Sequence, residues 1–371
     1  MHGQVPQIAE QPIAKLNAIR IIIVMMIAMG YASTMPFGES NAAGIPNPEF
    51  LAHLGYDPSW IGISLLFLLS GFLGMRSLTR HGSAKRYLSS RLFRNAPLLV
   101  FVTLFVILVI YPIFGEGRGS PGETLRTILF YFVGTVTCIK PGEPLPGLLD
   151  HAQYECLIQG AIWTLKWGVL AHIAMALGQR FDLLANRRFV ITVTLLSILF
   201  YIVINYIYLN EIAPVPGDII LASQLGWPFL VGVSLFQYWE KVSSRLAVNL
   251  MITAGFFAIA LFLSWTAFVP WSKAIIVTLT MAWAWVCVSL LKLEDHQFTA
   301  LNNWPPLALA LYLVNWPVAQ IILLSFPGLD WNVFMVVTLT TTVILAWGAH
   351  KLVSEKSFRY AQKRSFSILQ A

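Results

Sequence analysis

Few side chains inside the apolar stretches of this sequence could do chemistry. His172 lies in the stretch 161–178 and could take and return a proton near neutral pH. The alternative is that a hydroxyl or carbonyl of a neighbouring helix satisfies this histidine. Arg20 lies one turn inside the stretch 16–34, where a charge is costly, so it favours a specific partner. Tyr31 follows eleven residues later, but a phenol ordinarily has a pKa of about 10 and seldom transfers protons near neutral pH.

The elements that must position these residues are membrane helices. Apolar residues make up 57% of the chain and charged residues 11%, and the mean hydropathy is +0.71, far from the usage of soluble proteins. A helix needs about 20 apolar residues to cross a bilayer core. We therefore predict an all-α integral membrane bundle of about ten transmembrane helices. The predicted spans are 16–34, 59–76, 95–114, 161–178, 189–208, 218–237, 247–266, 272–291, 304–325 and 332–350.

An eleventh apolar segment, 124–138, has only fifteen residues before Lys140. It is short for a full crossing, so we predict a re-entrant or interfacial segment. The loop charges agree with this prediction. If the segment crossed fully, every later loop would be inverted relative to the rule that places Lys and Arg in cytoplasmic loops.

Basic residues mark one side of the bundle as cytoplasmic and place both termini there. The sequence predicts a single membrane domain over 1–371, with a core bundle at 11–356 and a basic tail at 357–371. The net charge of +7 indicates contact with anionic lipid headgroups rather than with nucleic acid. The largest basic group follows the second span: Arg76, Arg80, Lys85, Arg86, Arg91 and Arg94.

Two cysteines, Cys138 and Cys156, lie in or beside a predicted outer loop. They could close this loop as a disulfide in an oxidising periplasm, or they could be two unrelated small hydrophobic residues, which the spacing alone favours. No spacing of histidine, cysteine and carboxylate residues resembles a metal site, so no metal is predicted.

Motifs spread over nearly the whole chain resemble those of acyltransferase family 3, a family of integral-membrane proteins. In this family an arginine in the first span is followed eleven residues later by a histidine, and Arg20 and Tyr31 stand at these positions. The agreement of several stretches in the right order is more specific than any one motif. The other stretches are IGISLLFLLSGFL at 61–73, RLFRNAP at 91–97, GAIWTLKW at 160–167, LYLVNWPV at 311–318 and a weakened ending, EKSF, at 355–358.

Departures from the family pattern fall on titratable positions. Tyr31 replaces the histidine of the first span, Gly168 replaces a glutamate five residues after Trp163, and Asn315 replaces a late histidine. The resemblance implies that these positions line one substrate cavity. Trp163, Gly168 and Asn315 would make it aromatic and neutral, with Lys166 as the remaining charge nearby.

The candidate catalytic residues are therefore Tyr31 and His172. His172 lies four residues after Gly168, on the same helix face and one turn deeper, so it could replace the missing base. A base shifted by about 5.4 Å needs the acceptor and the thioester to shift as well.

The resemblance also implies that Arg20, Arg91 and Arg94 hold the phosphates of a coenzyme A thioester. A guanidinium forms charge-assisted and often bidentate hydrogen bonds to phosphate. Each arginine lies at the cytoplasmic end of a predicted span. The alternative for Arg91 and Arg94 is that they are positive-inside anchors at the lipid headgroups.

Three functions remain open from the sequence. The resemblance implies an O-acyltransferase of the bacterial inner membrane, which moves an acetyl or other acyl group from cytoplasmic acyl-coenzyme A to a surface polysaccharide or a lipid-linked oligosaccharide. The loss of the usual histidine and glutamate at Tyr31 and Gly168 leaves open whether the chain is an enzyme. The alternative is a non-catalytic family member that assists an active homologue or binds glycan or lipid. A transporter is a weaker alternative, because no inverted repeat supports it.

Overall fold

A computed structural model shows an all-helical chain and describes residues 14–37, 58–115, 120–138, 145, 147–149, 158–264, 270–290 and 305–356. Nine helices in these ranges are long and apolar enough to cross a membrane. The tenth predicted span, 272–291, is the helix α12 (Pro270–Leu290), in which the apolar stretch Ala274–Leu290 is shorter than the other nine. The prediction of an all-α integral membrane protein is therefore confirmed.

The chain forms two compact units. The first contains Met1–Ile23, Asn47–Leu88 and Trp167–Asn302, and the second contains Val24–Pro46, Ser89–Lys166 and Asn303–Ala371. Three helices continue from one unit into the other: α1 (Ala14–Thr34), α4 (Ala84–Phe105) and α7 (Trp163–Arg180).

The first unit is built around the packing of α3 (Pro58–His81) on α9 (Gly217–Gln237). Two glycines allow the backbones of these helices to touch. A Cβ atom on Gly71 would lie 2.0 Å from the carbonyl oxygen of Phe229, and a Cβ atom on Gly232 would lie 1.9 Å from that of Leu68. Small residues at membrane helix contacts have this effect.

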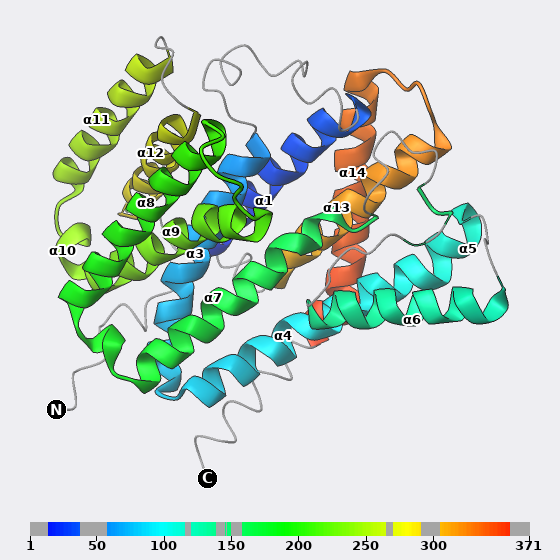
Figure 1. The fold of residues 1–371 in the computed structure, drawn as a ribbon, viewed down its shortest axis with the longest axis horizontal. Helices are drawn as coiled ribbons and strands as arrows, with labels where there is room; N and C mark the ends of the chain where they lie inside the picture. Colours follow the sequence, from blue (N-terminus) through cyan, green and yellow to red (C-terminus); the bar gives the residue numbers. More distant parts are fainter. Residues whose placement is uncertain are drawn as a thin grey trace. The chain divides into compact units, whose positions relative to one another are not determined.

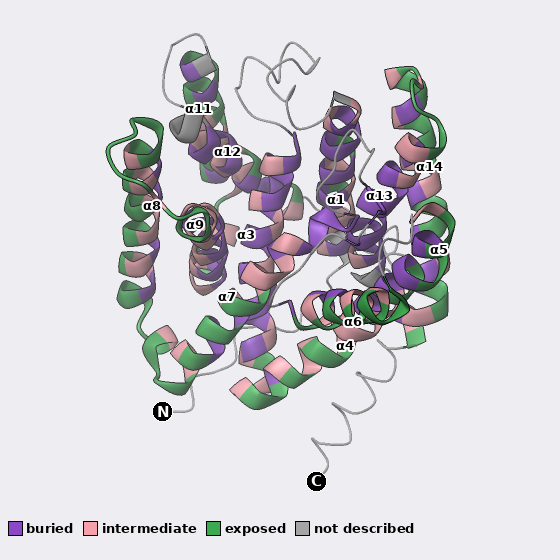
Figure 2. Ribbon diagram, turned by 45° about the vertical axis from the view of Figure 1, so that its right-hand side comes forward, coloured by how far each residue is buried: buried purple, intermediate pink, exposed green. Residues whose placement is uncertain are grey.

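The remaining helices of the first unit are arranged around this pair. The helix α9 also contacts α8, and α11 pairs with α12, which contacts α3 (Figure 1). Figure 2 shows many exposed residues along α8, as expected for an apolar helix that faces lipid. The bounds are α8 (Arg187–Leu209), the short helix α10 (Trp239–Ser243) and α11 (Leu246–Ser264).

The second unit is centred on α13 (Pro305–Ser325), in which residues 310–320 are all buried. The helix α13 packs against α14 (Trp331–Ala349) and the wider π-helical turn His350–Ser354 that follows it. The indole nitrogen of Trp331 donates a hydrogen bond of 3.2 Å to the carbonyl of Ser33, which joins α14 to the end of α1.

The short apolar segment of the sequence forms α6 (Pro121–Thr137), a helix of 17 residues that is not among the nine candidate spans. It begins three residues before the predicted segment, because Ser120 and Glu123 form a capping box and Pro121 occupies the first turn. Helical structure in a short segment agrees with the prediction, and its interfacial or re-entrant position stays a prediction.

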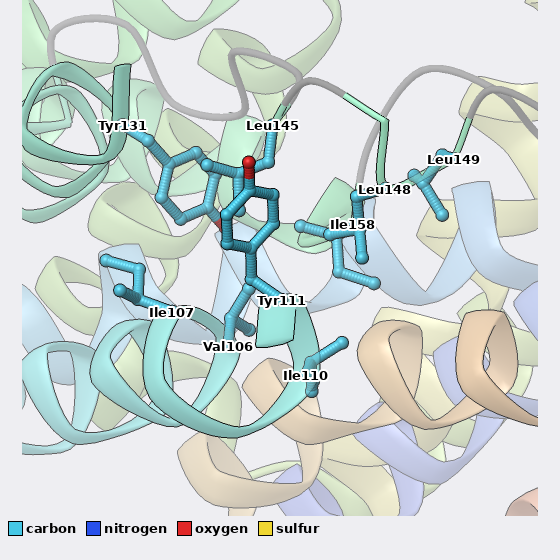
Figure 3. Close-up of a cluster of buried hydrophobic side chains, with 9 residues drawn as sticks. All are labelled: Val106, Ile107, Ile110, Tyr111, Tyr131, Leu145, Leu148, Leu149 and Ile158. Carbon is cyan, nitrogen blue, oxygen red and sulfur yellow. The ribbon is translucent and has the colours of Figure 1, made fainter. Parts of the chain in front are cut away.

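One face of α6 packs on the end of the preceding helical segment. Figure 3 shows Tyr131 of α6 beside Tyr111, which starts the short helix α5 (Tyr111–Phe114) after the π-helical turn Val106–Ile110. The Tyr131 hydroxyl donates a hydrogen bond of 2.5 Å to Oε1 of Gln159. Burial raises the pKa of Tyr131 above its ordinary value, so the phenol stays protonated and can donate.

At the end of α6, Cys138 caps the helix in the left-handed conformation and is a buried free cysteine. Cys156 lies outside the described residues. Whether the two cysteines are separate or paired therefore stays a prediction.

Candidate functional site

His172 lies in α7, within the first unit, and hydroxyl groups meet both of its ring nitrogens. Its Nε2 lies 3.1 Å from Oγ of Ser70 on α3, and its Nδ1 lies 2.7 Å from the hydroxyl of Tyr87 near the start of α4. The imidazole is 9% exposed and Tyr87 is fully buried. Hydroxyl groups of neighbouring helices therefore satisfy this histidine, which was one of the two alternatives. The same hydrogen bonds connect Ser70, His172 and Tyr87 in a row.

The backbone of α3 makes the space for this group. A Cβ atom on Gly74 would lie 3.1 Å from Cε1 of His172 and 3.1 Å from the Tyr87 hydroxyl, closer than ordinary contact. The ring of Phe229 on α9 lies against the imidazole, edge to face, with 5.3 Å between ring centroids. Three helices and the start of a fourth thus fix the imidazole in position.

The hydrogen bonds are consistent with a base that faces Ser70. In the neutral tautomer with its proton on Nδ1, His172 donates to the Tyr87 oxygen and accepts the Ser70 O–H at Nε2. The basic lone pair of the imidazole then points to a hydroxyl that could lose its proton. This order of hydroxyl, imidazole and orienting group is the arrangement by which proteins activate weak nucleophiles.

Tyr31 belongs to a different cluster, in the second unit. Its ring is 8% exposed and packs edge to face on Trp316, with 4.7 Å between centroids. Its side chain interacts with the hydroxyl of Tyr312, which lies 2.5 Å from Oγ1 of Thr164 and also donates a hydrogen bond of 2.9 Å to the carbonyl of Ala161. Tyr31 therefore lies against Trp316, beside the hydrogen-bonded pair Tyr312 and Thr164.

The two other replaced positions differ in their surroundings. Asn315 on α13 is 2% exposed, and neither its Nδ2 nor its Oδ1 has a hydrogen-bond partner within the described part of the chain. A Cβ atom on Gly168 would meet no heavy atom within 4 Å, so a larger side chain fits there. Both positions could thus hold or admit a polar group that the chain itself does not supply.

The remaining predicted residues are placed as follows. Trp163 begins α7 and Lys166 is half-buried in its first turn, in the second unit. Arg20 is half-buried on α1, in the first unit. Arg91 and Arg94 lie one turn apart on α4, in the second unit, and Nε of Arg94 donates to Oδ1 of Asn95 over 3.4 Å. Phosphate binding by these three arginines stays a prediction.

Comparison with known protein families identifies the family of this chain. A family model described as an acyltransferase domain, that of acyltransferase family 3, matches residues 13–351. The chain belongs to acyltransferase family 3. No curated protein and no solved structure matches the chain. Membership in acyltransferase family 3 agrees with the predicted resemblance and with the nine candidate spans of a multi-pass membrane protein.

On this acyltransferase 3 scaffold the structure adds Ser70 and Tyr87 to the site. In the sequence Ser70 could be read as a nucleophile, but a serine followed by Gly71 within a span more often permits close helix packing. The structure gives the packing role to Gly71 and leaves the Ser70 hydroxyl bound to His172. No sequence signal pairs Tyr87 with His172, since 85 residues separate them. In the described part of this family member no group of three or more metal-binding side chains occurs.

Proposed function

We propose that this chain is an O-acyltransferase that moves an acetyl or similar acyl group from cytoplasmic acyl-coenzyme A to a hydroxyl of a surface or exported carbohydrate. Family membership supports acyl transfer in a membrane. The observation that carries the proposal is that His172 is buried between Ser70 and Tyr87, with a hydroxyl at each ring nitrogen. The chain therefore keeps one oriented base although Tyr31 and Gly168 replace the usual pair.

The place of His172 along α7 agrees with this role. It lies four residues beyond Gly168, which is about 6 Å along the helix at 1.5 Å per residue. It also lies eight residues before Arg180 at the predicted cytoplasmic end of α7, about 12 Å away along the axis. His172 therefore lies near the middle of α7, about one turn closer than Gly168 to the predicted cytoplasmic end.

The test uses the detergent-purified chain with acetyl-coenzyme A and oligosaccharide from the cell envelope. Release of the coenzyme A thiol and ester formation on the sugar are measured together. We expect turnover by the unmodified chain and a loss of about 10²–10⁴-fold in His172→Gln, the usual contribution of a general base.

His81→Gln is the matched control, because His81 also bonds a serine, Ser77, but on its own helix near the end of α3. We expect this variant to keep full activity. A chain that transfers no acyl group, or that transfers it equally well without His172, would refute the proposal.

The second candidate is a non-catalytic partner of an active family member. The observation that favours it is the burial of Tyr31 against Trp316 in a group of phenols and hydroxyls, at the position where the family has its histidine. This function predicts co-purification with a homologous membrane protein, or retention of glycan without turnover. Acylation of sugar by a pure preparation of the single chain would exclude it.

A further inference from the structure

We propose that Ser70 is a covalent nucleophile, which carries the acyl group as an ester between the thioester donor and the carbohydrate acceptor. The inference rests on the proposed acyl transfer and deepens it, because it assigns the reaction two half-reactions instead of one direct transfer. The geometry that points to it is the Ser70 Oγ to His172 Nε2 distance of 3.1 Å, with the Tyr87 hydroxyl 2.7 Å from Nδ1 on the opposite side of the ring.

The hydrogen bond of Ser70 differs from those of Thr79 and Thr103, two other hydroxyl residues within helices. Thr79 and Thr103 donate to carbonyls four residues earlier on their own helices, over 2.9 and 2.8 Å. Such bonds engage the hydroxyl proton with the backbone. Ser70 instead reaches a basic nitrogen 102 residues away in sequence, and its bond with His172 is only partly buried. A hydroxyl that can give its proton to an imidazole is the requirement for a serine nucleophile.

The backbone around Ser70 is held at a fixed distance from the imidazole. Gly71, the next residue, lies in contact with the Phe229 backbone, and the Phe229 ring lies against His172. Gly74, one turn later, leaves the space that His172 and Tyr87 occupy. The two glycines therefore hold the Ser70 hydroxyl and the His172 imidazole in fixed positions. A nucleophile needs such a fixed position, because it attacks only from a narrow range of distances and angles.

The chemistry balances within the two half-reactions. In the first, His172 Nε2 takes the proton of the Ser70 hydroxyl, Oγ bonds to the acyl carbon, the carbon–sulfur bond breaks, and the proton passes to the coenzyme A thiolate. In the second, Nε2 takes the proton of the sugar hydroxyl, the sugar oxygen bonds to the acyl carbon, the ester bond to Oγ breaks, and the proton returns to Ser70. Tyr87 accepts from Nδ1–H and stabilises the imidazolium in both steps.

The experiment needs the donor only. The purified full chain is incubated with acetyl-coenzyme A labelled in the acetyl group, quenched in acid and denatured, and the label bound to protein is located by peptide mass spectrometry. We expect label on Ser70 in the unmodified chain and none there in Ser70→Ala. We expect His172→Gln to slow its appearance by about 10²–10⁴-fold.

Two further variants make the result specific. Ser77→Ala removes a second serine of α3, which bonds His81 on the same helix, and it should leave the label on Ser70 unchanged. Ser70→Cys replaces the alcohol by a thiol, so the adduct should change from an ester, which resists neutral hydroxylamine, to a thioester, which this reagent cleaves. The change in adduct chemistry identifies residue 70 even if Ser70→Ala folds poorly.

The failure of this inference differs from that of the proposed function. Turnover to sugar with no label on Ser70, or turnover that Ser70→Ala leaves at its original rate, would overturn the covalent intermediate and leave acyl transfer intact. A chain that neither becomes labelled nor consumes the thioester would overturn both. Exchange of labelled free coenzyme A into acetyl-coenzyme A without acceptor should occur, because the first half-reaction is reversible, and its absence in an active chain would also count against Ser70.

Discussion

Gly71→Ala tests the close contact between α3 and α9 on which the position of Ser70 and His172 depends. The added methyl carbon would lie 2.0 Å from the carbonyl oxygen of Phe229 and 2.9 Å from its carbonyl carbon, whereas ordinary contact begins at 3.4 Å. The helices must separate by about 1.4 Å to admit it, and both contacts are backbone atoms that cannot rotate away.

The magnitude follows from two opposing effects. Overpacking of a close contact costs about 1–3 kcal/mol. Alanine stabilises a helix interior relative to glycine by about 1 kcal/mol. Gly226→Ala is the matched control on α9, since a Cβ atom there would meet nothing within 4 Å and only the helix preference acts. We therefore expect Gly71→Ala to be less stable than Gly226→Ala by about 1–3 kcal/mol.

The assay is thermal unfolding of the purified chain and both variants in one detergent, followed by tryptophan fluorescence, together with the rate of thioester consumption. Gly71→Ala should unfold at a lower temperature and lose activity, because the separation moves Ser70 and Phe229 away from His172. Gly226→Ala should match or exceed the unmodified chain in stability and keep its activity. Equal stability of the two variants would refute the proposed backbone contact between α3 and α9.

Other changes test the donor site, the replaced residues and the cap of α6. The double variant Tyr31→His, Gly168→Glu should consume acetyl-coenzyme A faster than the unmodified chain, since Gly168 has open space for a carboxylate; unchanged or lower consumption by a folded variant would contradict this. Arg91→Ala should raise the KM for acetyl-coenzyme A, whereas the exposed Arg86→Ala should not, and equal KM values would exclude phosphate binding by Arg91. Hydrogen bonds from Ser120, the N-cap residue of α6, lower the pKa of Glu123. Protection of the amides at the start of α6 from hydrogen exchange should therefore be complete above the ordinary glutamate pKa and fall as the pH drops through the lowered pKa. In Glu123→Gln this pH dependence should be lost.

The helices could be predicted from the sequence because apolar length alone decides which segments a bilayer accepts. The sequence also distinguished the short segment 124–138, where the structure shows a helix of 17 residues, and its interfacial or re-entrant position stays a prediction. Its start was missed by three residues, since the capping box at Ser120 and Glu123 was not recognised. The wider π-helical turn at Val106–Ile110 was also missed, although Pro112 follows it and cannot donate a hydrogen bond to the carbonyl of Leu108.

Only His172 of the candidate site could be predicted from the sequence. His172 stood out because an ionisable side chain inside a membrane span is rare and costly. Its partners did not, since Ser70 resembles a packing residue and Tyr87 lies outside the predicted spans, in the basic loop before the third. Both pairings depend on how α3, α4 and α7 pack, which the spacing of residues along the chain cannot specify.

The most direct test of the account compares His172→Gln with Tyr31→Phe in one acyl-transfer assay, with purified protein, acetyl-coenzyme A and envelope oligosaccharide. The account places proton transfer on His172, so it predicts a fall in kcat/KM of about 10²–10⁴-fold in His172→Gln and little change in Tyr31→Phe. Loss of activity in Tyr31→Phe with full activity in His172→Gln would contradict the account and place the chemistry at the hydroxyl cluster around Tyr31 instead.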